Sequence, residues 1–249
     1  MRMSSDSSEP AGTQQPRDAA YWARQSANLR VSEAPVGAIN LNVDGRTVAG
    51  PLQGFGKMWR KTYSAQLTGC DVTPQEVIAT WKAHFPEFWP KGNRFYIPIT
   101  GIAPGEVALL NLRAGGMPLS TGVLVLYADD ESFTLMTPQG HMFAGMITFS
   151  AESGPTCAIA QADVLMRASD PIFEMGLQFG GHRQEDIFWQ HTLTALATRF
   201  GVQRPQVETR VVCVDPKRQW RYMGNVWHNS ALRTLLIALW GWIGRGQNS

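Results

Sequence analysis

The order of sequence patterns over residues 57–200 constrains this 249-residue chain more than any other feature. A strand-like segment leads into one short helix, and five segments of alternating polar and apolar residues follow before a second helix. The links between the alternating segments are only a few residues long, so they connect antiparallel neighbours and not βαβ units. The five segments predicted as strands are 106–113, 120–127, 132–136, 142–150 and 156–167.

Two helices are predicted on either side of this run. The first covers Thr73–Phe85, because Thr73 and Glu76 form a capping box and Pro74 suits the first helical position. The second covers Arg183–Phe200 and is ended by Gly201. Its apolar stripe consists of Trp189, Leu193, Leu196 and Phe200. The predicted fold class is α+β, in which a curved antiparallel sheet wraps around a long helix on its C-terminal side.

Three segments of this chain resemble the START/polyketide-cyclase-like superfamily, whose fold is called the helix-grip. They are TPQEVIATWKAHFPEFWP, LVLYADDESFTLMTPQGHMFAGMITFSAE and RQEDIFWQHTLTALATRF. The resemblance covers about residues 53–201, and the TPQGH turn is similar to an uncharacterised bacterial branch. It implies a cavity between the concave face of the sheet and the second helix. Members of the superfamily bind lipids, sterols, polyketides or hormones, and a minority catalyse cyclisation, dehydration or hydrolysis.

Four regions are predicted along the chain. Residues 1–20 have no apolar core and are expected to be a disordered leader, not a signal peptide. Residues 21–52 are expected to form a helix over Tyr21–Ala34 and a hairpin turning at Asp44-Gly45. Residues 53–201 are the helix-grip domain. Residues 202–249 are expected to be a basic, tryptophan-rich extension with an amphipathic helix.

Alternation along the predicted strands selects the side chains that face the interior. A row of small residues on 156–167 leaves space opposite it, which either a ligand or Phe188 and Trp189 could fill. The predicted pocket-lining residues are Phe133, Leu135, Phe143, Ile147, Phe149, Ala158, Ala160, Ala162, Val164, Trp189, Leu193 and Leu196.

No arrangement of polar residues identifies a reaction. The five histidines and three cysteines show no metal-ligand spacing, so we expect no metal and no cofactor. His141 follows a tight turn and is expected to face solvent. Asp163 falls on the outward face, and Asp170 is explained as a helix cap. No catalytic residue is therefore assigned.

The last part of the chain is strongly basic. Residues 204–249 contain seven Lys and Arg against two acids, and the remainder has a net charge of −3. Asn229 or Ser230 can cap a helix with apolar positions at spacings of three and four. Such a helix could pack on its own domain, pair with a second subunit, or lie on an anionic membrane. The candidate contact residues are Arg221, Trp227, Leu236, Trp240 and Trp242.

These observations favour a protein that binds or transfers an apolar small molecule or lipid. A cyclase or dehydratase acting in the same cavity, and an interaction protein with a filled core, remain open alternatives. A net charge of +2 argues against nucleic acid as a partner. The longest apolar run, Leu235–Ile243, is too short to span a bilayer. A cytoplasmic location, with possible peripheral membrane contact, is expected.

Overall fold

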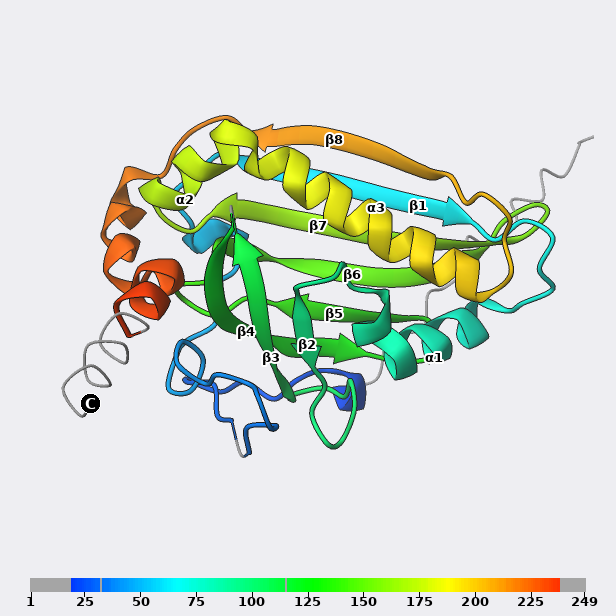
Figure 1. Ribbon diagram of the computed structural model, residues 1–249, viewed down its shortest axis with the longest axis horizontal. Helices are drawn as coiled ribbons and strands as arrows, with labels where there is room; N and C mark the ends of the chain where they lie inside the picture. Colours follow the sequence, from blue (N-terminus) through cyan, green and yellow to red (C-terminus); the bar gives the residue numbers. More distant parts are fainter. Residues whose placement is uncertain (1–18, 32, 115, 238–249) are drawn as a thin grey trace, which may run out of the picture.

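A computed structural model describes residues 19–31, 33–114 and 116–237. One antiparallel sheet contains eight strands in the order β2-β3-β4-β5-β6-β7-β1-β8 (Figure 1). Their bounds are β1 Met58–Gln66, β2 Arg94–Tyr96, β3 Val107–Ala114, β4 Met117–Ala128, β5 Ser132–Met136, β6 Phe143–Ser153, β7 Ala158–Ala168 and β8 Val207–Asp215. The predicted antiparallel run from β3 to β7 is confirmed.

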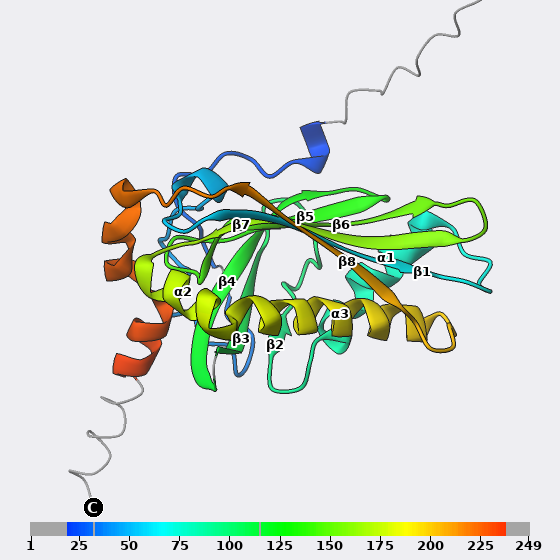
Figure 2. The same ribbon diagram turned by 90° about the horizontal axis from the view of Figure 1, so that it is seen from above.

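The longest helix crosses one face of this sheet (Figures 1 and 2). It is α3 (His182–Arg199), and it contacts β1, β7 and β8. The shorter α1 (Pro74–His84) packs against β6 and β7, near the C-terminal end of α3. The remaining helical segments are η1 Ala19–Tyr21, η2 Pro51–Gln53, η3 Phe85–Phe88, α2 Pro171–Gly176, η4 Leu177–Gly181 and η5 Trp220–His228. A curved sheet around a long helix is the helix-grip arrangement, so the predicted fold class is confirmed.

Helix starts follow the local sequence. The Thr73 side chain accepts a hydrogen bond from Glu76 N at 3.2 Å, and Glu76 Oε2 accepts one from Thr73 N at 2.8 Å. This capping box is the one that the sequence predicts. Asp170 caps α2 in the same way, accepting from Ile172 N and Phe173 N. Between α2 and α3, Gly180 adopts a φ of 105°, which favours glycine and kinks the helical path.

The predicted N-terminal helix is wrong. Among the described residues of 21–34 there is no α-helix, and residues 41–43 form a bend in place of a strand. The chain instead runs along the outer face of the sheet, where Leu29 and Val43 pack with Leu109 of β3. Burial of these side chains against β3 shows that tertiary contacts outweigh local helical preference here.

The sheet continues beyond the boundary predicted at residue 201. β8 pairs with β1 over nearly its whole length and extends the sheet by one strand. The buried Arg167 of β7 secures the end of β8, because its guanidinium pairs with Asp215 and donates to Lys217 O at 2.9 Å. The segment predicted as an extension is therefore partly built into the domain.

The C-terminal helix packs through polar groups. Within it, residues 230–237 are described, and Asn229 caps them by accepting from Leu232 N at 3.0 Å. Ser230 and Thr234 are buried against the domain, where Asn42 donates to Thr234 Oγ1 at 3.2 Å. The apolar side chains of the helix point away from this contact, and Leu236 is 56% exposed.

Candidate functional site

The predicted pocket-lining side chains come together beneath α1 and α3. Ten of the twelve are buried in one apolar core, and Phe143 and Trp189 are half-buried at its margin. The register explains the convergence, because Phe133 lies opposite Phe149, and Phe149 lies opposite Ala162. Whether any of these side chains contacts a ligand stays a prediction.

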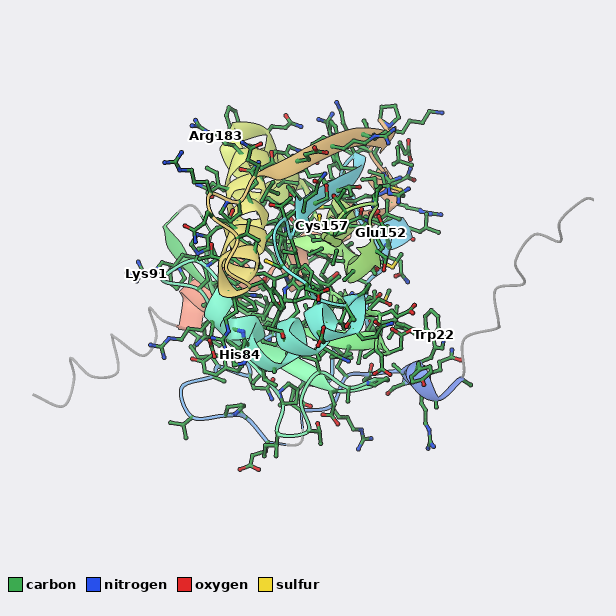
Figure 3. All side chains as sticks on the ribbon, turned by 90° about the vertical axis from the view of Figure 1, so that its right-hand side faces the viewer. Trp22, His84, Lys91, Glu152, Cys157 and Arg183 are labelled. Carbon is green, nitrogen blue, oxygen red and sulfur yellow. The ribbon has the colours of Figure 1, made fainter. Side chains whose placement is uncertain are left out.

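Aromatic side chains fill the interior at the α1 end. The ring centroids of Trp81 and Phe85 each lie 5.0 Å from the ring centroid of Phe149, and that of Trp189 lies 5.5 Å from it. Phe133 stacks on Phe149 at 4.7 Å. Figure 3 looks from the end where α1 lies, with His84 labelled on it, and side chains occupy the space between α3 and the sheet. The volume opposite the alanine row is therefore largely packed here.

At the edge of this aromatic cluster, the apolar side chains on α3 are only half-buried. Phe188 and Trp189 are edge-to-face at 4.9 Å, and Phe188 also contacts Trp89 of the segment after η3 at 5.0 Å. Ile97, which follows β2, and Leu112 of β3 are also half-buried, and both pack against the core. Neighbouring half-exposed apolar side chains form a surface that an apolar ligand would cover.

A buried ionic cluster lies between β1 and the first turn of α3. It consists of Lys61, Tyr63, His182, Glu185 and Asp186, and we call it the Lys61 cluster. Lys61 is only 1% exposed, and its Nζ lies 2.9 Å from Glu185 Oε2 and 2.8 Å from Asp186 Oδ1. Tyr63 donates its hydroxyl proton to Asp186 Oδ1 at 2.7 Å. Glu185 Oε1 is buried without a hydrogen-bond partner among the described residues.

The charges of this cluster do not balance. One lysine faces two carboxyl groups, and burial raises the pKa of Glu185 to about 7 despite the nearby ammonium group. Burial and the negative charge of Glu185 also raise the pKa of Tyr63 above its ordinary value. Burial, followed by the charge of Lys61, lowers the pKa of His182. Glu185 can therefore exchange a proton near neutral pH, which is the property of a general acid or base.

Sequence reasoning missed the Lys61 cluster, although a signal for it exists. Lys61 and Tyr63 share one face of β1 with the buried Ala65, so alternation places Lys61 among core positions. A lysine at such a position needs a buried counter-charge. The partners lie about 120 residues later on α3, and only the folded structure identifies them.

His141 is another correction, because it is buried and not exposed to solvent. The C-terminal segment covers its turn, and Ser230 N donates to Gly140 O at 2.9 Å. His141 Nδ1 accepts from Phe143 N at 3.0 Å, and burial lowers the pKa of His141 to about 4. The imidazole is therefore neutral near pH 7 and has a structural role.

The candidate contact residues of the tail are exposed where they are described. Arg221 is exposed, Trp227 is 83% exposed, and Leu236 follows on the next helix. Trp240 and Trp242 lie outside the described residues. Within the described ranges, no helix has the length and apolar character to cross a bilayer, and no group of three or more potential ligands could hold a metal ion.

Comparison with known proteins finds likenesses of structure. Neither a family model nor a curated protein matches the chain. Ara h 8.0201 is 13% identical with a TM-score of 0.42, covering 57% of this chain and 97% of its own. A START superfamily protein from Mycobacterium smegmatis is 21% identical with a TM-score of 0.38, covering 59% and 98%. The di-domain ARO/CYC StfQ from the steffimycin biosynthetic pathway is 10% identical with a TM-score of 0.43, covering 59% and 53%.

These likenesses concern the fold alone. START and ARO/CYC proteins, which the sequence resemblance names, are among these structures. They identify neither a ligand nor a reaction for this chain.

Proposed function

We propose that the protein binds an apolar small molecule or lipid against the inner face of the sheet beneath α3. The observation that supports this most is the half-exposed aromatic pair Phe188 and Trp189 on α3, beside an otherwise buried apolar face. An apolar ligand covering these rings would remove their remaining surface from water.

The test is native mass spectrometry of protein purified from its source, followed by solvent extraction. We expect an apolar adduct on the intact protein and about a tenfold loss of its occupancy or affinity in Trp189→Ala. Trp220→Ala is the matched control, because Trp220 is an exposed tryptophan of η5. Equal loss in both variants, or no adduct in the intact protein, contradicts the proposal.

An acid–base enzyme of the cyclase or dehydratase type is the second candidate, and the Lys61 cluster favours it. A carboxyl group poised near neutrality could take a proton from an apolar substrate and return it, while Lys61 and Tyr63 hold the neighbouring carboxylate. The two candidates differ in one readout. A carrier releases the extracted compound with its mass unchanged after incubation, whereas a dehydratase lowers the mass by one water.

Peripheral membrane contact is proposed for the tail of the protein in a cytoplasmic setting. Trp227 and Leu236 expose apolar surface next to Arg221, and cations beside inserted apolar groups suit an anionic bilayer. Each basic residue near such a surface adds about 1 kcal/mol of binding free energy. The buried Ser230 and Thr234 side of the helix already contacts the domain, which leaves the apolar side free for lipid or for a second subunit.

Co-sedimentation with vesicles tests the membrane proposal. Binding is expected to rise with the fraction of anionic lipid, to fall with salt, and to weaken in Leu236→Asp and in Arg221→Glu. Leu52→Asp is the control, since Leu52 is exposed on η2 outside the tail. If the intact protein ignores anionic vesicles at low salt, and Leu236→Asp instead lowers its oligomeric state, the helix is a dimer contact.

A further inference from the structure

Among the described residues, no strand pairs with the outer edge of β8, which is one long border of the sheet. β8 is the terminal strand, hydrogen-bonded only to β1, and Figure 1 shows it along the border of the sheet. β8 contains nine residues, whereas the strand at the other border, β2, contains three. A short edge resists pairing with another chain, but a long one offers a row of free backbone donors and acceptors.

The side chains of β8 are also exposed on both faces. Val211 is 46% exposed on the inner face, and Val212 and Val214 are 42% and 52% exposed on the outer face. The outer-face valines line an open groove of about 580 Å³ that extends across β1 and β7. Three exposed valines on one edge strand are unusual for a surface in permanent contact with water.

Two charges on β8 lack partners. Glu208 and Arg210 line the same groove, so they share one face, and neither forms an ion pair among the described residues. They share this face two residues apart on one strand, yet they form no ion pair with each other. On an adjacent antiparallel strand, opposite side chains are within about 5.5 Å.

If a two-fold axis through Thr209 related two copies of β8, both Glu208 and Arg210 would gain a partner of opposite charge. An antiparallel β8 from a second copy would then place its Arg210 opposite Glu208 and its Glu208 opposite Arg210. On the other face Val207 would lie opposite Val211. An axis through Arg210 would instead set two arginines against each other, which disfavours that register.

We propose that β8 pairs with β8 of a second copy of this chain about Thr209, forming a continuous sheet across a two-fold dimer. Such an interface is isologous, because the same edge serves both copies. Strand addition supplies main-chain hydrogen bonds, and the Glu208–Arg210 pairs select the register. This interface is separate from the tail and does not depend on the proposed ligand.

Sedimentation velocity of the full chain over a wide concentration range tests the dimer. The wild-type protein is expected to dimerise, and Arg210→Glu or Glu208→Arg to raise the dimer dissociation constant at least tenfold. The double variant Glu208→Arg/Arg210→Glu restores both cross-strand pairs and is expected to return to within about threefold of the wild type. Lys91→Glu, an equal charge change on an exposed residue outside the strands (Figure 3), is expected to have no effect.

Three results would overturn the proposal. The first is a protein that stays monomeric at every concentration. The second is a dimer that neither single charge inversion weakens, or that the double variant fails to restore. The third is a dimer lost in Leu236→Asp but kept in Arg210→Glu, which would place the contact at the C-terminal helix.

Discussion

Replacing Lys61 with methionine is expected to lower the free energy of unfolding by about 3–5 kcal/mol at pH 8. Methionine fits the space of the lysine side chain but leaves Glu185 and Asp186 without their buried cation. An uncompensated buried charge is far more destabilising than the loss of an exposed pair. Chemical denaturation followed by tryptophan fluorescence measures the change.

The same strand provides the control for this variant. Arg60, one residue earlier, faces outward and pairs with Asp163 at 2.6 Å, with most of its side chain exposed. Arg60→Met is therefore expected to cost about 1 kcal/mol or less. The double variant Lys61→Met/Glu185→Gln should recover part of the loss, because it removes one of the two orphaned charges. Equal effects of Lys61→Met and Arg60→Met would show that the Lys61 cluster contributes nothing beyond a surface ion pair.

The contributions of Glu185 and His141 to the free energy of unfolding are expected to change with pH in opposite directions and partly cancel. The pKa of Glu185 is raised to about 7, so its stabilising effect is complete below about pH 4.5 and is lost as pH rises through 7. The pKa of His141 is lowered to about 4, so its effect is complete above about pH 6.5 and is lost as pH falls through 4. The two slopes have opposite signs and similar size, about 3 kcal/mol each, and cancel over much of pH 4.5–6.5.

Single variants separate the two contributions. Relative to the wild type, Glu185→Gln is expected to gain about 3 kcal/mol of stability as pH rises from 4.5 to 7. His141→Asn keeps an acceptor for Phe143 N, and it should gain a similar amount relative to the wild type as pH falls from 6.5 to 4. Other titrating groups affect all three proteins alike and drop out of the differences. If the free energy of unfolding of each variant changed with pH in parallel with that of the wild type, these pKa shifts would be contradicted.

Local patterns predicted the elements whose causes are local. β5 occupies the predicted residues 132–136, and the capping box of α1 forms as expected. Short links fixed the antiparallel order from β3 to β7. β8 was missed because its apolar and polar residues do not alternate regularly, and no row of buried side chains marks it as a strand.

The candidate site was predicted in its apolar part and missed in its ionic part. Alternation on β6 and β7 selects Phe149 and Ala162 from the sequence, because one strand suffices to define its inner face. The pairing of Lys61 with Glu185 depends on where α3 crosses β1, and no local pattern contains that information. The exposure of His141 was predicted wrongly for the same reason, because the segment that covers its turn comes some 90 residues later.

The place of β1 in the sheet also determines when the protein can fold. Of the eight described strands, β1 is made first, yet its two neighbours, β7 and β8, are made last. Until residue 168 emerges, β1 has no strand to pair with, and Lys61 has no counter-charge until α3 follows. Contacts between such distant segments carry a large loop-closure cost, which slows folding. The nascent chain therefore carries a partly apolar strand without its native partner while roughly 100 further residues are made.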